Sequence, residues 1–575
     1  MDRQETKKYK KTSLGLYLAG LIGLALLAVP HLLDTRAGAV ESGDMWLIRN
    51  YVLVAGSGIL AAALLGAMLF GFAGLPVFQK RAAAAKEDAK RPAAGPVRLE
   101  TVFLTAALLF GALYLYVLPP LSAPDEIRHY VSAYQLSNRL MGLPAAGEDG
   151  KVYVREEDWF AEDPTGEYEP YRTEGGALAT DEDGADGAKV LGQTLTEETY
   201  RLIHEKGAFR YEELSGDGLA LSNHLPVVTT PFGYLMPAVG ITLARLLGLN
   251  SLWLLYLGRL MNLFMYVAVT YLAIRRLPFG KSLMFGVALL PMTIHLSASF
   301  SYDVLILAGV FYLTAHCLYL AYQAERVRPA DILILAFVMA VAGPCKMVYA
   351  VFMGLCLLIP VRKFGGWGRW ALSAGCVLGA WAAAMVLVNS QTVASYAAET
   401  ENYISWAGEA GFTMSGLLHQ PVKLFQMFYN TVIWQAEYWH LTMIGAYLGN
   451  VDVVLDVPYL AVVLFTVCLL GLTFRKPGDT LVLTGGKRCW IWILCAACAA
   501  GTMFSMLIAW TPVSSRIICG VQGRYFLPFL PILLMTWKND IVVLTKNADR
   551  SILYLMCCAN AFVLMRLFSI VSMRL

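Results

Sequence analysis

Apolar runs of about 20 residues recur along most of the chain, and this pattern limits the fold more than any other feature. A helix needs roughly 20 apolar residues to cross the hydrocarbon core of a bilayer. The 575 residues are 57% hydrophobic and 15% charged, whereas a soluble protein of ordinary composition carries about 25% charged residues. The sequence therefore predicts an all-α polytopic membrane protein.

Two stretches rich in lysine and arginine determine the expected topology. They are the N-terminal MDRQETKKYKK and the linker QKRAAAAKEDAKRPAAGPVR at 79–98. Because basic connections stay on the cytoplasmic side, we predict a cytoplasmic N-terminus, about thirteen transmembrane helices and a C-terminus outside. The first apolar run, 13–33, is too long for the hydrophobic part of a signal peptide, so we predict an uncleaved first span.

Acidic residues concentrate in the segment that follows the third predicted span, which the topology places outside the cell. Residues 121–230 carry 22 acidic and 9 basic side chains. We expect short helices and irregular structure there, with a flexible excursion at 173–189. The predicted units are an N-terminal hairpin and basic linker (1–98), a first core span (99–120), the acidic loop with an interfacial helix at 231–249 (121–250), a transmembrane core (251–389), a second external loop (390–455) and C-terminal helices (456–575).

The stretch LPPLSAPDEIRHY at 118–130 places titratable groups where a long apolar run ends. Asp125, Glu126 and His129 lie within about one helical turn of each other, and such groups are costly to hold at a membrane boundary. They are therefore candidates for an active or transport site. The alternative is a helix start after Pro124, where carboxylates favour the positive helix end.

Other polar residues fall on the same membrane face under this topology. Arginine and lysine side chains there have donors that match a phosphate or pyrophosphate. Arg516 and Arg524 could instead lie at lipid headgroups, and Glu437 and His440 lie among aromatic residues typical of an interfacial belt. The candidates for binding a substrate or its phosphate are Lys346, Arg516, Gln522, Arg524, Tyr302, Asp303, His224 and Arg259.

The phrase SAPDEIRHYVSAYQLSNRLMG at 122–142 resembles the opening motif of a bacterial multipass membrane family known as domain of unknown function 2142. Further similar stretches follow in the same order. They include LWLLYLGRLMNLFMY (252–266), LPFGKSLMFGVALLPMTIHLSASFSYD (277–303), KMVYAVF (346–352) and GVQGRYFLPFLP (520–531). The resemblance covers roughly residues 100–570 and leaves the first two predicted spans outside it.

This family looks like a relative of the GT-C glycosyltransferases, which use polyprenyl-phosphate sugars as donors. The resemblance implies a GT-C-like fold in the bacterial plasma membrane, with the large loop after the third span. It places Asp125, with Glu126 second and His129 in support, at the position of the catalytic carboxylate. The implied partners are the bilayer, a polyprenyl-phosphate-linked sugar and a cell-envelope glycan or lipid-linked acceptor, with no nucleic acid. The only cofactor left open is a divalent metal at Asp125 and Glu126.

Two other classes of function stay open. A transporter or flippase of lipid-linked glycans would use the same cationic groups, with Asp125 coupling protons. We find no repeat and no matched pair of interrupted helices, which are the usual indication of an inverted-repeat transporter. A polysaccharide polymerase or ligase would share the topology and the lipid-linked donor, and would differ in the size of the group transferred.

Overall fold

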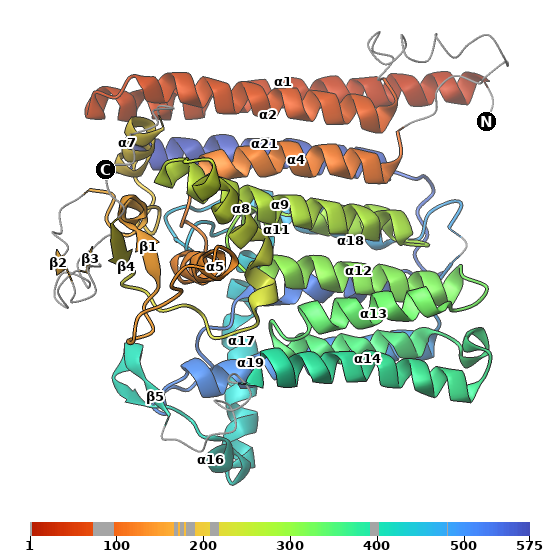
Figure 1. The fold of residues 1–575 in the computed structure, drawn as a ribbon. Coiled ribbons are helices and arrows are strands. Elements are labelled where there is room, and N and C mark those ends of the chain that lie inside the picture. The colour runs from red at the N-terminus through yellow and green to blue at the C-terminus, as the bar shows by residue number, and fades with distance from the viewer. Residues whose placement is uncertain are drawn as a thin grey trace.

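The computed structural model describes residues 3–72, 97–165, 171–172, 178–179, 190–207, 218–390, 402–479 and 481–575. Most of the basic linker at 79–98 and of the excursion at 173–189 lies outside these residues. The described part is mostly helical, with its long helices aligned in one bundle (Figure 1).

Eight helices in the described ranges are long and apolar enough to cross a membrane, which confirms a polytopic membrane protein. Their sequences are apolar on most faces because lipid or other helices surround them. These helices are α1 (Arg3–Ser42), α2 (Trp46–Phe70), α4 (Leu99–Val117), α9 (Ser251–Arg276), α12 (Asp303–Tyr322), α14 (Trp367–Val388), α19 (Gly485–Trp510) and α21 (Asp549–Met573). The membrane-spanning part begins in α1 at Thr12.

Shorter helices complete the bundle. They are α10 (Lys281–Ala288), α11 (Pro291–Ser297), α13 (Pro329–Ala342), η3 (Met347–Leu358), η4 (Val361–Phe364), α18 (Tyr459–Thr473), η6 (Gly523–Phe529) and α20 (Leu530–Met535). Helices α12 and α21 are mostly buried, whereas α1 and α14 lie at the edge. The hairpin of α1 and α2 packs on α21 and α4 (Figure 1).

Two of the predicted spans are interrupted helices, which the sequence patterns did not reveal. Residues 282–299, an apolar run that we counted among the thirteen predicted spans, form α10 followed by α11, and Pro291 opens the second piece. A proline cannot donate to the preceding turn, so carbonyls are freed at the break. Tyr266 donates to the carbonyl of Ala288, and Asn560 donates to that of Leu289. A second run that we counted among these spans, 525–543, is formed by η6 followed by α20, and the helix ends at Met535.

The helix ends define two faces of the bundle. One face, which we call the loop face, holds the C-terminal end of α4 and the N-terminal ends of α9 and α12 (Figure 1). The opposite face, which we call the basic face, holds many of the basic connections. These contain Arg275, Arg276, Lys281, Arg326, Arg328, Arg362, Lys363, Lys487 and Arg488.

The acidic segment at the loop face contains more regular structure than we predicted. Helix α5 (Glu126–Leu140) is followed by β1 (Tyr153–Arg155), η1 (Glu156–Ala161), β2 (Tyr171–Arg172), β3 (Leu178–Ala179), α7 (Glu197–Lys206), β4 (Leu219–Leu221), η2 (Pro231–Tyr234) and α8 (Leu235–Leu246). The strands form a sheet in the order β1-β4-β3-β2, with β1 and β4 antiparallel. Tyr134 and Arg155 both bind the buried carboxylate of Asp158, which shows how an acidic segment can still fold compactly.

The segment 390–455, which we predicted as an external loop, contains a 24-residue helix, α17 (Pro421–Ile444). It follows β5 (Tyr403–Ile404), η5 (Ser405–Ala407), β6 (Glu409–Ala410) and α16 (Met414–Leu418). In Figure 1 α17 runs across the direction of the long helices at their loop-face ends. Its exposed side chains include Val422, Phe425 and Ile433. A helix with such a face suits a position at the membrane surface.

Candidate functional site

Asp125 stands at the start of α5, but its side chain does not cap that helix. Its backbone is left-handed, with φ 57°, and its carboxylate accepts no capping hydrogen bond. The backbone amide of Ala123 donates instead to Glu126, at 2.9 Å. The Asp125 side chain is 66% exposed and lies 3.5 Å from Arg524. Left-handed residues other than glycine are uncommon and concentrate at functional sites.

Glu126, the adjacent carboxylate, is completely buried and has a different environment. Its Oε1 lies 3.3 Å from Nε of Arg259, which is also fully buried, and it accepts a hydrogen bond from the amide of Phe300. Arg259 donates to the carbonyls of Ala298 and Leu118. These contacts tie α5 and α9 to the connection before α12. We therefore assign Glu126 and Arg259 a structural role and do not retain them as catalytic or phosphate-binding candidates.

Several of the predicted site residues do meet at the loop face. We call this group the loop-face cluster; its members are Asp125, His129, Tyr302, Asp303, Lys346, Arg524 and Tyr525. Lys346 donates to Asp303 at 2.7 Å, and its Nζ lies 4.2 Å from the ring centre of Tyr525. Arg524 lies within 3.4 Å of the Tyr525 hydroxyl. The cluster thus joins residues from α5, α12, η6 and the start of η3.

Arg524 is the member of the cluster with the most unused hydrogen-bonding capacity. Its side chain is 4% exposed. Its Nε and Nη1 have no hydrogen-bond partner among the residues that the structure describes. Buried guanidinium nitrogens without partners are costly, and the planar donors of arginine match the oxygens of a phosphate. Arg524 is therefore the best candidate in the cluster for binding an anion.

His129 occupies the inner side of the cluster. Its Nδ1 lies 2.8 Å from the Tyr234 hydroxyl, and its ring packs edge-on against Tyr302. Burial lowers the pKa of His129 to about 4. The carboxylates of Asp303 and Asp125 act in the opposite direction and raise this pKa, whereas the positive charges of Arg524 and Lys346 lower it further. The imidazole is therefore neutral near pH 7 and supports Tyr234 and Tyr302 by packing and hydrogen bonding.

The low pKa of His129 predicts an acid-sensitive fold. The unfolded chain binds this proton near pH 6.5 and the folded protein only near 4, so stability falls as the pH drops through this window. The contribution is at most about 1.4 kcal/mol per pH unit. Melting temperatures measured between pH 7 and 4 should therefore depend less on pH in His129→Asn than in the unaltered protein. The same substitution at exposed His419 should leave the pH dependence unchanged, and an equal slope in both variants would contradict the assignment.

The remaining candidates lie apart from the cluster. His224 lies near Arg128, and burial lowers its pKa. Arg516 is exposed, with its carbonyl accepting from Asn430. Gln522 precedes η6, and within the described ranges its side chain makes no hydrogen bond to the cluster. His440 pairs with Thr466 on α18, and Glu437 makes no ion pair with any described residue.

Tyr234 is a neighbour of the cluster that sequence patterns missed. It lies in TTPFGYLMP, where Gly233 comes so close to Tyr302 that a Cβ would lie 2.7 Å from the Tyr302 Cβ. In the sequence, the glycine before Tyr234 was the one feature that could have indicated this close packing. Alone, a Pro-Phe-Gly-Tyr stretch also fits an ordinary turn.

A second close approach positions Arg524. A Cβ on Gly523 would lie 1.8 Å from the Trp439 carbonyl oxygen and 2.6 Å from the Met443 nitrogen, both backbone atoms of α17. Gly523→Ala should therefore destabilise the protein by about 1–3 kcal/mol, as overpacking does, and should displace Arg524. A thermal melt of the purified protein measures the first effect. Gly375→Ala on α14, where a Cβ meets nothing within 4 Å, is the control and should melt no lower than the unaltered protein.

The two carboxylates that we considered as metal ligands, Asp125 and Glu126, have different surroundings. Both oxygens of Glu126 accept hydrogen bonds from backbone amides, and its buried carboxylate faces Arg259, whereas the exposed carboxylate of Asp125 faces Arg524. Across the described residues, no group of three or more His, Cys, Asp or Glu side chains is arranged to hold a metal.

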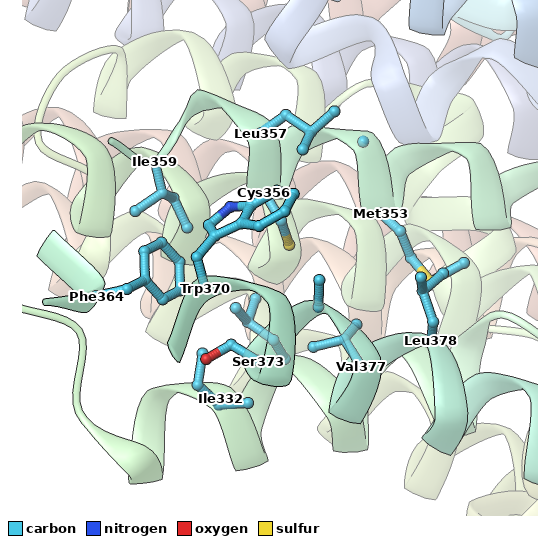
Figure 2. Close-up of a pocket in the computed structure, with 13 residues that line it drawn as sticks. Ile332, Met353, Cys356, Leu357, Ile359, Phe364, Trp370, Ser373, Val377 and Leu378 are labelled. Carbon is cyan, nitrogen blue, oxygen red and sulfur yellow. The ribbon is translucent and has the colours of Figure 1, made fainter. Parts of the chain in front are cut away.

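An apolar cavity of about 260 Å³ lies away from the cluster, toward the basic face, between α13, η3 and α14 (Figure 2). Trp370, Phe364, Ile359 and Met353 line it, and the lining hydroxyl of Ser373 donates to a carbonyl of its own helix. Its lining suits hydrocarbon, not a sugar or phosphate.

Long apolar helices and a polar cluster at one end of them define a polytopic membrane protein with a candidate site at its loop face. A model of the predicted membrane protein family DUF2142 matches residues 108–533, and the chain belongs to this family. The resemblance of the sequence motifs is thereby confirmed. Helices α1, α2 and α21 lie outside the matched range. No curated protein and no solved structure matches the chain.

Proposed function

We propose that this protein is a membrane glycosyltransferase of GT-C type that takes a sugar from a polyprenyl-phosphate donor. The observation that carries the proposal is the pairing of an exposed carboxylate, Asp125, with the buried guanidinium of Arg524 at 3.5 Å. The carboxylate can reach an acceptor hydroxyl, and the guanidinium can bind the donor phosphate. The acceptor is a glycan or lipid-linked molecule of the cell envelope.

In the proposed reaction the acceptor oxygen attacks the anomeric carbon of the donor sugar. The bond from that carbon to the phosphate oxygen breaks, and its electron pair leaves with the polyprenyl phosphate. The hydroxyl proton passes to the carboxylate of Asp125. Attack opposite the phosphate inverts the anomeric centre. Arg524, with the ion pair of Lys346 and Asp303 beside it, would stabilise the negative charge that stays on the phosphate.

The donor's lipid chain has apolar surface available in the bundle. Lys346 directly precedes η3, and Met353 and Cys356 of η3 line the cavity of Figure 2. At roughly 2 Å per residue, Cys356 lies about 20 Å along η3 from Lys346. A polyprenyl chain whose phosphate lies at the cluster is long enough to extend to this cavity.

We further infer that the loop face is extracytoplasmic and that the N-terminus is cytoplasmic. The basic connections gathered at the opposite face support this orientation through the positive-inside rule. With α13, η3, α18, the η6–α20 segment and the α10–α11 pair each counted as one crossing, the eight long helices belong to a bundle of about thirteen crossings. Reporter fusions after Glu148 and after Arg326 should then report opposite compartments. Reports of one compartment from both sites would overturn this topology.

Product analysis tests the proposed activity. Purified protein in vesicles should convert a labelled polyprenyl-phosphate sugar and an envelope acceptor into free polyprenyl phosphate and a product with a new glycosidic bond. Transfer of a single sugar separates this activity from that of a polymerase or ligase, which transfers a longer glycan. Complete recovery of the intact donor with every envelope acceptor class offered would overturn the proposal.

A transporter of lipid-linked glycans is the second candidate. The observation in its favour is that the interrupted segments α10–α11 and η6–α20 contact each other, and that η6 carries Arg524. Interrupted helices that meet near a binding site are typical of secondary transporters. Movement of the intact labelled donor across the vesicle membrane, without a new bond, would favour this candidate.

A further inference from the structure

A second cavity lies at the basic face, between the ends of α9 and α12. Its volume is about 330 Å³. Leu272, Arg275 and Arg276 line it from α9, and Tyr312, Tyr319 and Gln323 line it from α12 or its C-cap. The loop-face cluster lies at the other ends of the same helices. Along α12, which contributes to both sites, about 14 Å of helix separates Asp303 of the cluster from Tyr312 of the cavity.

The two arginines of this cavity differ in their partners. Arg276 lies 3.3 Å from Asp331 on α13, and its guanidinium covers the ring of Tyr319 at 3.7 Å. Asp331 therefore balances its charge. Arg275 is exposed, and it forms no ion pair with any residue that the structure describes. The cavity thus carries one positive charge that does not pair with any acidic side chain in the described ranges.

Further hydrogen-bond donors extend along α12 from the level of Arg275 into the bundle. Tyr312, Tyr319 and Gln323 are spaced seven and four residues apart, which places them on one face of α12. From Gln323 at the helix end, the row extends inward by about 16 Å. Arg276 Nε is buried and has no hydrogen-bond partner among the described residues. The site is therefore cationic at the membrane boundary and partly apolar toward the membrane interior, with Leu272 exposed beside it.

We propose that this cavity binds the phosphate-bearing headgroup of an anionic lipid, with the headgroup at Arg275 and Arg276 and the glycerol region beside Tyr312 and Leu272. The phosphate supplies the negative charge that balances Arg275 and accepts hydrogen bonds from the guanidinium and the tyrosine hydroxyls. A site that is charged at the boundary and apolar below it matches the polarity of a lipid. This site is independent of the proposed glycosyl transfer.

Native mass spectrometry of the full-length protein, released from micelles with phosphatidylglycerol or phosphatidylcholine, tests the proposal. We expect preferential retention of phosphatidylglycerol. Arg275→Gln should weaken that retention about fivefold, the effect of one basic residue near an anionic lipid surface. Tyr312→Phe should weaken it less, since it removes only a hydroxyl. Arg326→Gln, an exposed charge on the same face outside the cavity, is the matched control and should change nothing.

Three results would overturn the proposal. Equal retention of the two lipids would remove the need for an anionic headgroup. Equal losses of phosphatidylglycerol retention in Arg275→Gln and Arg326→Gln would show that the lipid is attracted to the whole basic face and not to this cavity. Displacement of phosphatidylglycerol by millimolar inorganic phosphate, with no residual preference for the lipid, would assign the site to the free ion.

Discussion

Asp125→Asn should reduce sugar transfer from a polyprenyl-phosphate donor by about 10²–10⁴-fold, the usual contribution of a general base. Asparagine has the size of aspartate and tolerates the left-handed backbone that this position requires, with φ 57°. The substitution therefore removes the negative charge and leaves the start of α5 in place. Rates measured at equal amounts of folded protein isolate the chemical effect.

Glu148→Gln provides the matched control for Asp125→Asn. Glu148 is an exposed carboxylate in the same loop-face segment, and its loss should leave the rate unchanged. Normal transfer by Asp125→Asn, in a preparation where the unaltered protein is active, would exclude Asp125 as the base. It would not by itself exclude glycosyl transfer, because another group could accept the proton.

Arg259→Met should destabilise the folded protein by about 3–5 kcal/mol, because it leaves the buried carboxylate of Glu126 without its charged partner. Both side chains are fully buried. Glu126→Gln should have a similar effect, since it leaves the guanidinium of Arg259 uncompensated. The double variant carries neither charge and should be more stable than the sum of the two single losses indicates. Thermal unfolding in a fixed detergent measures all three variants.

Glu198→Gln is a suitable control for this series. Glu198 forms an ion pair with Arg201 at the surface, where both side chains are more than 40% exposed, and such pairs contribute at most about 1 kcal/mol. If loss of the buried pair lowered the free energy of unfolding no more than loss of this surface pair, Glu126 would again be a candidate for a catalytic role.

The sequence predicted the membrane class, and it placed several candidate residues on one face of the bundle, because both inferences depend on local signals. Long apolar runs indicate spans, and charged residues at their ends are rare enough to stand out. Family membership was likewise visible in ordered motifs, and the match to residues 108–533 confirms it. Topology predicts that Asp303, Lys346 and Arg524 share one face of the bundle, since each lies at the same end of an apolar segment, but it does not predict their contact.

The different environments of Asp125 and Glu126 could not be predicted from sequence. Adjacent carboxylates look equivalent there, and only the left-handed turn at Asp125 directs one outward and the other toward Arg259. The interrupted helices were also missed. Their hydropathy resembles that of continuous spans, and the side chains that satisfy the freed carbonyls, Tyr266 and Asn560, come from distant helices. Such partners depend on tertiary packing, which periodicity does not record.

The contact between Gly523 and α17 joins two backbones without a side chain between them. Side chains can change rotamer and absorb small movements, whereas two touching backbones transmit them. Arg524 follows Gly523 directly, and α17 presents Val422, Phe425 and Ile433 outward. A change in bilayer thickness or lateral pressure that tilts α17 would therefore also move the guanidinium of Arg524 at the candidate site.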